Sequence, residues 1–251
     1  MTWPFENDTS AITKKLAKKS LQSEKRRNLM VVIAVALASC LICFSIVMAL
    51  STRQIEKNHV EDTYEAVYTR ITEEDVSTLK ELDDFSRVGE YYMLAVEPAK
   101  QGYNASYIYC DEETMYIARD QMKLLEGRLP QKEDEVAVSR YFLSNYGADA
   151  GIGEKVMLNS ESFHGEYTVT GILEGYKEKE VNGSSILLSK EALKGWSGYD
   201  PADYRAYVHF KNEQQMDETE LTARSREIAK EYQLEMPIMN LSYMKFYKQP
   251  V

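Results

Sequence analysis

A glycine-rich run ending in lysine is the first stretch of this chain whose residue types could do chemistry. It extends from Gly147 to Lys155, and phosphate-binding loops have a similar composition. Such loops follow the pattern G-x-x-x-x-G-K-[ST]. Counted from Gly147, Ile152 falls in the place of the second glycine, and counted from Lys155, Val156 falls in the place of the hydroxyl residue. We interpret the run as a turn, so the sequence gives no reason to expect nucleotide binding.

Histidine and cysteine residues are the next candidates, because they ligate metals and act as acids, bases or nucleophiles. His59, His164 and His209 are dispersed without the spacing of zinc ligands, and no serine stands in a G-x-S-x-G context. Cys40 and Cys43 are spaced as in redox or metal pairs, but they lie in an apolar run with no other ligand nearby. We interpret them as small apolar side chains.

Clusters of acidic residues at positions 133–135 and 178–180 could in principle bind Ca²⁺. They lack the alternating oxygen ligands and central glycine of calcium loops, and solvated surface is the better interpretation. Cys110 stands alone outside the apolar run, so no disulfide can form within the rest of the chain. We predict that the protein is not an enzyme, binds no metal and needs no cofactor.

Composition limits the partners of the chain. Its 251 residues carry 40 acidic and 30 basic side chains, a net charge of −10 and an isoelectric point near 5.0. This balance argues against binding to nucleic acid. The length suffices for one domain or two small lobes with hydrophobic cores of their own.

Residues 29–50 form an uncharged apolar run that predicts a transmembrane helix, because about 20 apolar residues span the hydrocarbon layer. The polar stretch that follows contains no proline or glycine, so we expect the helix to continue as a stalk to about residue 58. A cleaved signal peptide is the competing interpretation, but its apolar core would be shorter and nearer the N-terminus. We therefore predict a location in the plasma membrane.

Basic residues precede the apolar run and acidic residues follow it, which by the positive-inside rule places the N-terminus in the cytoplasm. Residues 1–28 are then a cytoplasmic basic segment, and residues 59–251 an extracytoplasmic domain. Residues 11–21 have amphipathic spacing, and their lysines could face lipid headgroups or a partner, or serve only to fix orientation. The basic side chains are Lys14, Lys15, Lys18, Lys19, Lys25, Arg26 and Arg27.

Hydrophobic spacing and turn residues in the external part predict short strands mixed with helices, an α+β fold. We expect strands at 64–70, 88–96, 105–110, 135–139, 153–158, 167–173, 185–188 and 204–210, with a short extended piece at 236–239. We expect helices at 73–82, 112–125, 140–146, 189–193 and 217–232. Gly127 should take a left-handed conformation after the helix 112–125, and Pro130 should prevent that helix from resuming.

The phrase EGRLPQKEDEVAVSRYFLSNYGADAGIGEKVML followed by YTVTGIL resembles the extracytoplasmic core domain of MacB/FtsX-like ABC transporter permeases. That family carries a G-R-x-P phrase, then E-[IV]-x-[LIV]-S, a helix, an [IL]-G-[DE] turn and an [FY]-x-[IV]-x-G strand. Matching residues, to which the resemblance gives structural roles, are Gly127, Pro130, Glu135, Ser139, Gly153 and Gly171. The order of basic lead, first span and large external domain also agrees.

The resemblance implies a two-lobed external domain in which a strand–helix lobe is interrupted by a small β-rich lobe at about 129–181. It further implies an N-terminal part of a permease, with partners in a cytoplasmic ABC ATPase subunit, further transmembrane helices or a second permease copy, and membrane lipid. ATP hydrolysis by the ATPase would then move the external domain for export or mechanotransmission. The alternative is a single-pass, membrane-anchored binding or regulatory domain without transport activity. The sequence does not select a substrate.

Overall fold

The computed structural model describes residues 9–98, 102–119, 121–146, 149–175, 178 and 182–248. The chain divides into two compact units, Met1–Glu56 and Lys57–Val251. Part of the expected cytoplasmic segment, residues 1–8, and the predicted lobe boundary at residue 181 lie outside the described residues.

The described part of the first unit is helical. Helix α1 covers Ser10–Ser23, and helix α2 covers Lys25–Val60 and so includes both the apolar run and the expected stalk. At about 1.5 Å per residue, α2 is roughly 54 Å long, enough to cross a bilayer and continue beyond it. It is the candidate membrane span of the described chain, and its apolar side chains are exposed, as side chains facing lipid would be. The predicted helix over the apolar run and its continuation to residue 58 are present, and its crossing of a membrane stays a prediction.

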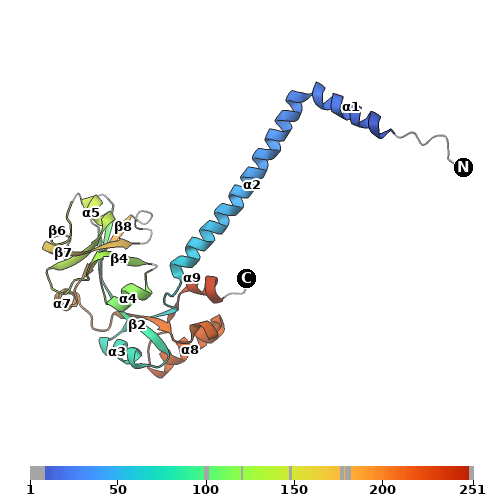
Figure 1. Ribbon diagram of the computed structural model, residues 1–251. Coiled ribbons are helices and arrows are strands. Elements are labelled where there is room, and N and C mark those ends of the chain that lie inside the picture. Colours follow the sequence, from blue (N-terminus) through green and yellow to red (C-terminus); the bar gives the residue numbers. More distant parts are fainter. Residues whose placement is uncertain are drawn as a thin grey trace. The chain divides into compact units, whose positions relative to one another are not determined.

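The second unit is built on one mixed sheet (Figure 1), which contains ten strands of the described chain in the order β10-β1-β9-β2-β3-β8-β5-β7-β4, with β6 paired to β7. The strands are β1 Ala66–Ile71, β2 Phe85–Pro98, β3 Asn104–Cys110, β4 Met122–Gly127, β5 Glu135–Ser139, β6 Lys155–Asn159, β7 His164–Gly175, β8 Gly183–Leu188, β9 Tyr204–Phe210 and β10 Ile238–Met239. The helices are α3 Glu73–Glu81, α4 Glu112–Ile117, α5 Arg140–Tyr146, α7 Lys190–Gly195, α8 Glu218–Glu231 and α9 Leu241–Tyr243. A 3₁₀ turn covers Glu213–Gln215 and a π-helical turn Met244–Lys248.

Helix starts follow the capping signals of the sequence. Thr72 and Asp75 form a reciprocal capping box at α3, and Asp217 and Glu220 form another at α8. The apolar faces of these helices then pack on the sheet, where Leu79, Leu221 and other side chains are fully buried with tyrosines of the strands. Strands β2 and β3, which cover the strands predicted at 88–96 and 105–110, pair antiparallel.

The predicted helix 112–125 is wrong in its second half. Helix α4 ends at Ile117, and Met122–Gly127 is strand β4, which pairs antiparallel with β7. Met122 is buried, Lys123 is exposed and Leu124 is half-buried, so the residues that fit helical spacing also fit the alternation of a strand. These residues form a strand and not a helix because they are hydrogen-bonded to β7, more than forty positions later in the chain, with Lys123 opposite Glu174.

The sheet continues across the predicted borders of the small lobe. Strands β5, β6 and β7 lie within residues 129–181, while β4 precedes that range and pairs with β7, and β8 follows it and pairs with β5. The two-lobed division with these borders stays a prediction.

Candidate functional site

The phrase around Gly127 forms a compact corner between β4, β5 and β7. Arg128 makes two charge-assisted hydrogen bonds to Glu135, of 2.8 and 2.7 Å, which close the intervening loop. One oxygen of Glu135 also accepts the backbone N–H groups of Gln131 and Lys132. Pro130 is buried within the same loop. Four hydrogen bonds to one carboxylate therefore fix the entry into β5.

The hydrogen bond from Arg128 holds the pKa of the Glu135 carboxyl at about 2, well below its ordinary value of 4.5. Because the folded-state pKa is depressed, the carboxylate stabilises the fold above about pH 4.5, and this contribution is lost as the pH falls toward 2. We expect Glu135→Gln to flatten the pH dependence of the unfolding free energy between pH 5 and 2. Urea unfolding of the full chain in detergent at several pH values measures this dependence. The same substitution at the exposed neighbouring residue, Glu133→Gln, is the control. An unchanged slope in Glu135→Gln would contradict the assignment.

Gly127 and Gly171 face each other across β4 and β7, where no side chain fits. A Cβ on Gly127 would lie 2.2 Å from the carbonyl oxygen of Thr170, and one on Gly171 would lie 2.6 Å from that of Arg128. Both contacts are shorter than any allowed by van der Waals radii. The left-handed φ expected for Gly127 is present, at +84°, although the residue ends a strand and not a helix.

Ser139 and Gly153 lie at two other turns of the same part of the sheet. The buried Ser139 hydroxyl accepts the backbone N–H of Phe142 at the start of α5 and lies 2.9 Å from the Ser184 hydroxyl. Gly153 precedes β6 with φ +86°. The corner thus brings together Gly127, Pro130, Glu135 and Gly171, while Ser139 and Gly153 lie outside it. A structural role for all six stays a prediction.

We expect Gly153→Val to destabilise the domain by more than ~1 kcal/mol, because a β-branched residue is strained at positive φ. A Cβ there would meet no atom within 4 Å, so the backbone conformation alone carries the effect. Gly151→Val is the matched control, since a Cβ at Gly151 would make only an ordinary contact of 3.7 Å with Glu154. Equal thermal stability of the two variants would contradict the prediction.

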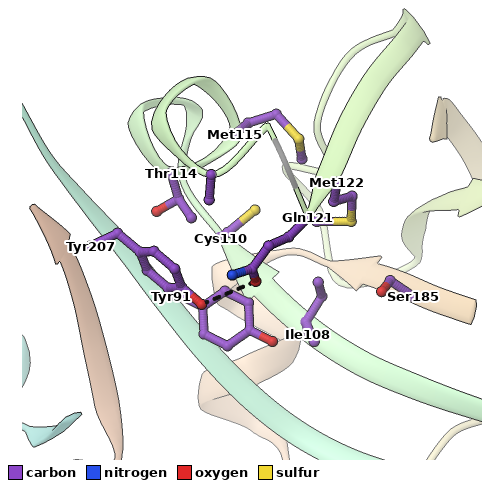
Figure 2. A pocket seen from close by; sticks show the side chains of 10 residues that line it. Tyr91, Ile108, Cys110, Thr114, Met115, Gln121, Met122, Ser185 and Tyr207 are labelled. Atoms are coloured by element: carbon purple, nitrogen blue, oxygen red, sulfur yellow. Dashed lines mark hydrogen bonds between the residues drawn. The ribbon is translucent and has the colours of Figure 1, made fainter. Parts of the chain in front are cut away.

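A small cavity near α4 contains the thiol of Cys110 (Figure 2). It has a volume of about 60 Å³ and is lined by Tyr91, Met115, Gln121 and Tyr207 among others. This is room for a few water molecules, whereas ligand pockets are several times larger. Burial raises the pKa of the Cys110 thiol well above its ordinary value, so the thiol is protonated and unreactive. The cavity is therefore part of the core.

The segment Asn240–Lys248 packs against the end of α2 and the loop after it. We name this contact the junction, made of residues 57–65 and 240–248. The backbone N–H of Asn240 donates to the carbonyl of Glu65 at 2.8 Å, and its side-chain amide donates to that of Tyr64 at 3.0 Å. The Tyr247 hydroxyl donates to the carbonyl of Lys57, whose ammonium lies 5.1 Å from the centre of the Tyr247 ring.

Two buried polar groups anchor the far side of the segment. The Lys248 ammonium, with its side chain only 5% exposed, lies 3.0 Å from the Glu213 carboxylate. The Tyr243 hydroxyl donates to the same carboxylate at 2.6 Å, and the Tyr243 ring stacks on that of Tyr247. Glu213 follows β9, so the segment is fastened to the central strands as well as to α2.

One residue of the junction, Glu65, has a carboxylate with no solvent exposure. One of its oxygens is 2.7 Å from Nδ1 of His209, and the other accepts the backbone N–H of Phe210 at 2.8 Å. Burial lowers the pKa of His209, but the hydrogen bond and charge of Glu65 outweigh it and raise that pKa above 6.5. Burial also raises the pKa of Glu65, which His209 partly opposes.

None of these groups is arranged for bond-making chemistry. Within the described residues, no three His, Cys, Asp or Glu side chains gather as a metal site would require. His59 lies on α2, His164 begins β7 and His209 pairs with Glu65. The junction instead joins the end of α2, β1, β9 and the 240–248 segment by hydrogen bonds and stacked rings.

Comparison with known proteins gives a family match. Residues 29–226 match the sequence model of the MacB-like periplasmic core domain. Similar solved structures include the extracellular domain of the noncanonic ABC-type transporter YknZ from Gram-positive bacteria, at 14% identity and a TM-score of 0.49, covering 71% of this chain and 100% of that one. The periplasmic region of MacB from Actinobacillus actinomycetemcomitans has 12% identity and a TM-score of 0.49, with 74% and 91% covered. No curated protein matches the sequence.

Proposed function

The chain belongs to the family with a MacB-like periplasmic core domain, and from this we propose that it is a permease subunit whose external domain is moved by ATP hydrolysis in a separate ATPase subunit. The observation that carries the proposal is the extent of the match. It runs from residue 29 to residue 226, through the apolar helix and the sheet domain together. The work of the transporter would be export or mechanotransmission, with further transmembrane helices or a second copy completing the assembly.

The junction supports a mechanical role. Helix α2 contains no proline or glycine between Lys25 and Val60, so its hydrogen bonds are continuous and it can transmit a tilt without absorbing it. At its end, the contacts of Tyr247 with Lys57 and of Asn240 with Tyr64 join it to the segment 240–248. We propose that a displacement of the end of α2 is passed through these contacts to this segment and to the sheet.

A direct test uses the permease with its cognate ATPase subunit in nanodiscs. Cys40, Cys43 and Cys110 are replaced by alanine, and a spin label is attached at Arg226→Cys, an exposed site on α8. We expect the distance between labels on two permease copies to differ between nucleotide-free and vanadate-trapped states. Tyr247→Ala should keep ATPase activity but diminish the change, whereas Leu241→Ala, 77% exposed on the same segment, should not.

Failure of the ATPase to co-purify, together with an unchanged distance, would favour the alternative of a membrane-anchored binding domain without transport activity. A normal distance change in Tyr247→Ala would instead remove the junction from the mechanism while leaving the permease function in place.

The proposal also requires a fixed orientation, with residues 14–27 in the cytoplasm and residues 62–251 outside. The basic side chains before the apolar run motivate this orientation. Protease added to intact cells should remove an epitope placed after Val251, while an epitope before α1 should be cut only after the cells are permeabilised. The opposite pattern of protection would exclude this topology.

A further inference from the structure

An open groove lies between α4 and β4. Its volume is about 410 Å³, within the range of ligand and peptide sites. From α4 and the turn after it come Met115, Tyr116 and Arg119, and from the β4 side come Lys123 and Leu124. The groove exists because the chain ends its helix at Ile117 and returns as a strand beside it.

The groove has an apolar floor with an aromatic side chain exposed in it. Met115, Leu124 and Leu129 line it, and Tyr116 is 46% exposed. The guanidinium of Arg87 lies 4.2 Å from the centre of the Tyr116 ring, which fixes the orientation of the ring. An exposed, oriented tyrosine beside aliphatic side chains is typical of protein-binding surfaces.

Positive charge gathers around this floor although the chain as a whole is acidic, at −10. Among the described residues, Arg119, Lys123 and Arg128 line the groove together with the carboxylate of Glu112. Arg128 is paired with Glu135, and Arg119 donates to the carbonyl of Glu61 and lies 3.8 Å from the Asp62 carboxylate. Lys123 is exposed and lies opposite Glu174 in the pairing of β4 with β7. No ion pair of Lys123 is present in the described part of the chain, so its ammonium is the groove cation that can receive an incoming carboxylate.

Strand β4 is also an edge of the sheet. Among the described strands it is hydrogen-bonded to β7, and no strand lies on its other side. An open edge presents backbone donors and acceptors in a row, which an extended peptide can pair with. The strand is short and has a bulge between Leu124 and Glu126, features that disfavour open-ended pairing between copies while leaving room for one added segment.

We propose that this groove binds an extended, acidic segment of a partner protein, which pairs with the edge of β4, places a carboxylate near Lys123 and packs apolar side chains on Tyr116 and Leu124. Charge complementarity selects acidic side chains. The strand edge favours a polypeptide over a lipid headgroup, because a headgroup would use the cations but not the row of backbone groups.

The full chain in nanodiscs of zwitterionic lipid tests this inference. The probe is a fluorescein-labelled peptide of eight residues that alternate glutamate and valine, and its control alternates lysine and valine. Fluorescence anisotropy should show binding of the glutamate peptide only. Lys123→Glu should weaken it at least about tenfold, because a cation is replaced by a like charge. Arg226→Glu, the same kind of reversal at an exposed site on α8, should leave the affinity unchanged.

Hydrogen exchange gives a readout that does not depend on the variants. Peptide addition should slow exchange at residues 122–127, because the added strand protects the open edge. Equal binding of both peptides, equal weakening by Arg226→Glu, or unchanged exchange in β4 would each overturn the inference. So would competition by vesicles of phosphatidylglycerol that depends on Lys123, since the groove would then recognise anionic lipid.

Discussion

Gly127→Ala is expected to destabilise the domain by about 2–4 kcal/mol. Roughly 1 kcal/mol comes from placing alanine at φ +84°, and about 1–3 kcal/mol from the overlap of its Cβ with the Thr170 carbonyl oxygen at 2.2 Å. The clash is with backbone, so no rotation of a side chain can relieve it. Domains of this size are stable by only about 5–15 kcal/mol, so the variant should lose much of its folded population on mild heating.

Gly153→Ala is the matched control for this prediction. Its φ of +86° is nearly the same, but a Cβ there would meet no atom within 4 Å. It should cost only about 1 kcal/mol. Urea unfolding of both full-length variants in detergent, followed by tyrosine and tryptophan fluorescence, gives the difference between them. A difference near zero would show that β4 and β7 can separate at Gly127 without cost.

His209→Leu should cause the largest loss of unfolding free energy of any single substitution around Glu65, about 3–5 kcal/mol near pH 7. The substitution removes the imidazole that lies 2.7 Å from the Glu65 carboxylate, which has no solvent exposure. The hydrogen bond that this carboxylate then keeps is the one from the backbone N–H of Phe210. Because the backbone carbonyl of Glu65 accepts a hydrogen bond from the backbone N–H of Asn240, loosening of Glu65 should also reach the segment 240–248.

The pH dependence of the unfolding free energy of His209→Leu shows whether the buried charge of Glu65 causes the loss of stability. Burial raises the pKa of Glu65 above 4.5, and loss of His209 removes groups that lower it. A carboxyl with a raised folded-state pKa favours the fold at low pH, and this contribution is lost as the pH rises through that pKa. Relative to the double variant Glu65→Leu/His209→Leu, which lacks both groups, His209→Leu should therefore be less destabilised at pH 5 than at pH 7.

The double variant Glu65→Leu/His209→Leu is the control, because replacing both members of a buried pair by apolar residues is often neutral. We expect it to be more stable than His209→Leu alone and to have no such pH dependence. A single variant that is equally destabilised at both pH values, or a double variant no better than it, would show that packing and not the buried charge determines the loss.

Local signals in the sequence were sufficient for much of the fold. The apolar run of α2, the capping boxes at Thr72 and Asp217 and the strand patterns at β5 and β9 depend on residues within one or two turns of each other. Such short-range preferences persist whatever the rest of the chain does. The family phrase likewise pointed to the corner at Gly127, although Arg128, which closes it, was not among the residues singled out.

The helix predicted for 112–125 is wrong over residues 122–127 because local sequence does not contain the pairing with β7. The apolar residues of this segment fit both the spacing of a helix and the alternation of a strand. Hydrogen bonding of β4 to β7 makes the second half a strand. The groove follows from that pairing, so no reading of the sequence alone could have located it. Here the tertiary structure overrides propensity, because backbone hydrogen bonds with a distant strand outweigh a weak helical preference.

The sequence by itself determined that the chain has an apolar helix long enough to span a membrane, an α+β domain after it and no residues spaced for catalysis. Only the tertiary structure joined His209 to Glu65, 144 positions earlier, and Tyr247 to Lys57, 190 positions earlier. Contacts over such separations leave no periodic trace, because they depend on which strands become neighbours in the sheet. The junction that links α2 to the domain is therefore a property of the folded sheet and not of any single stretch of the chain.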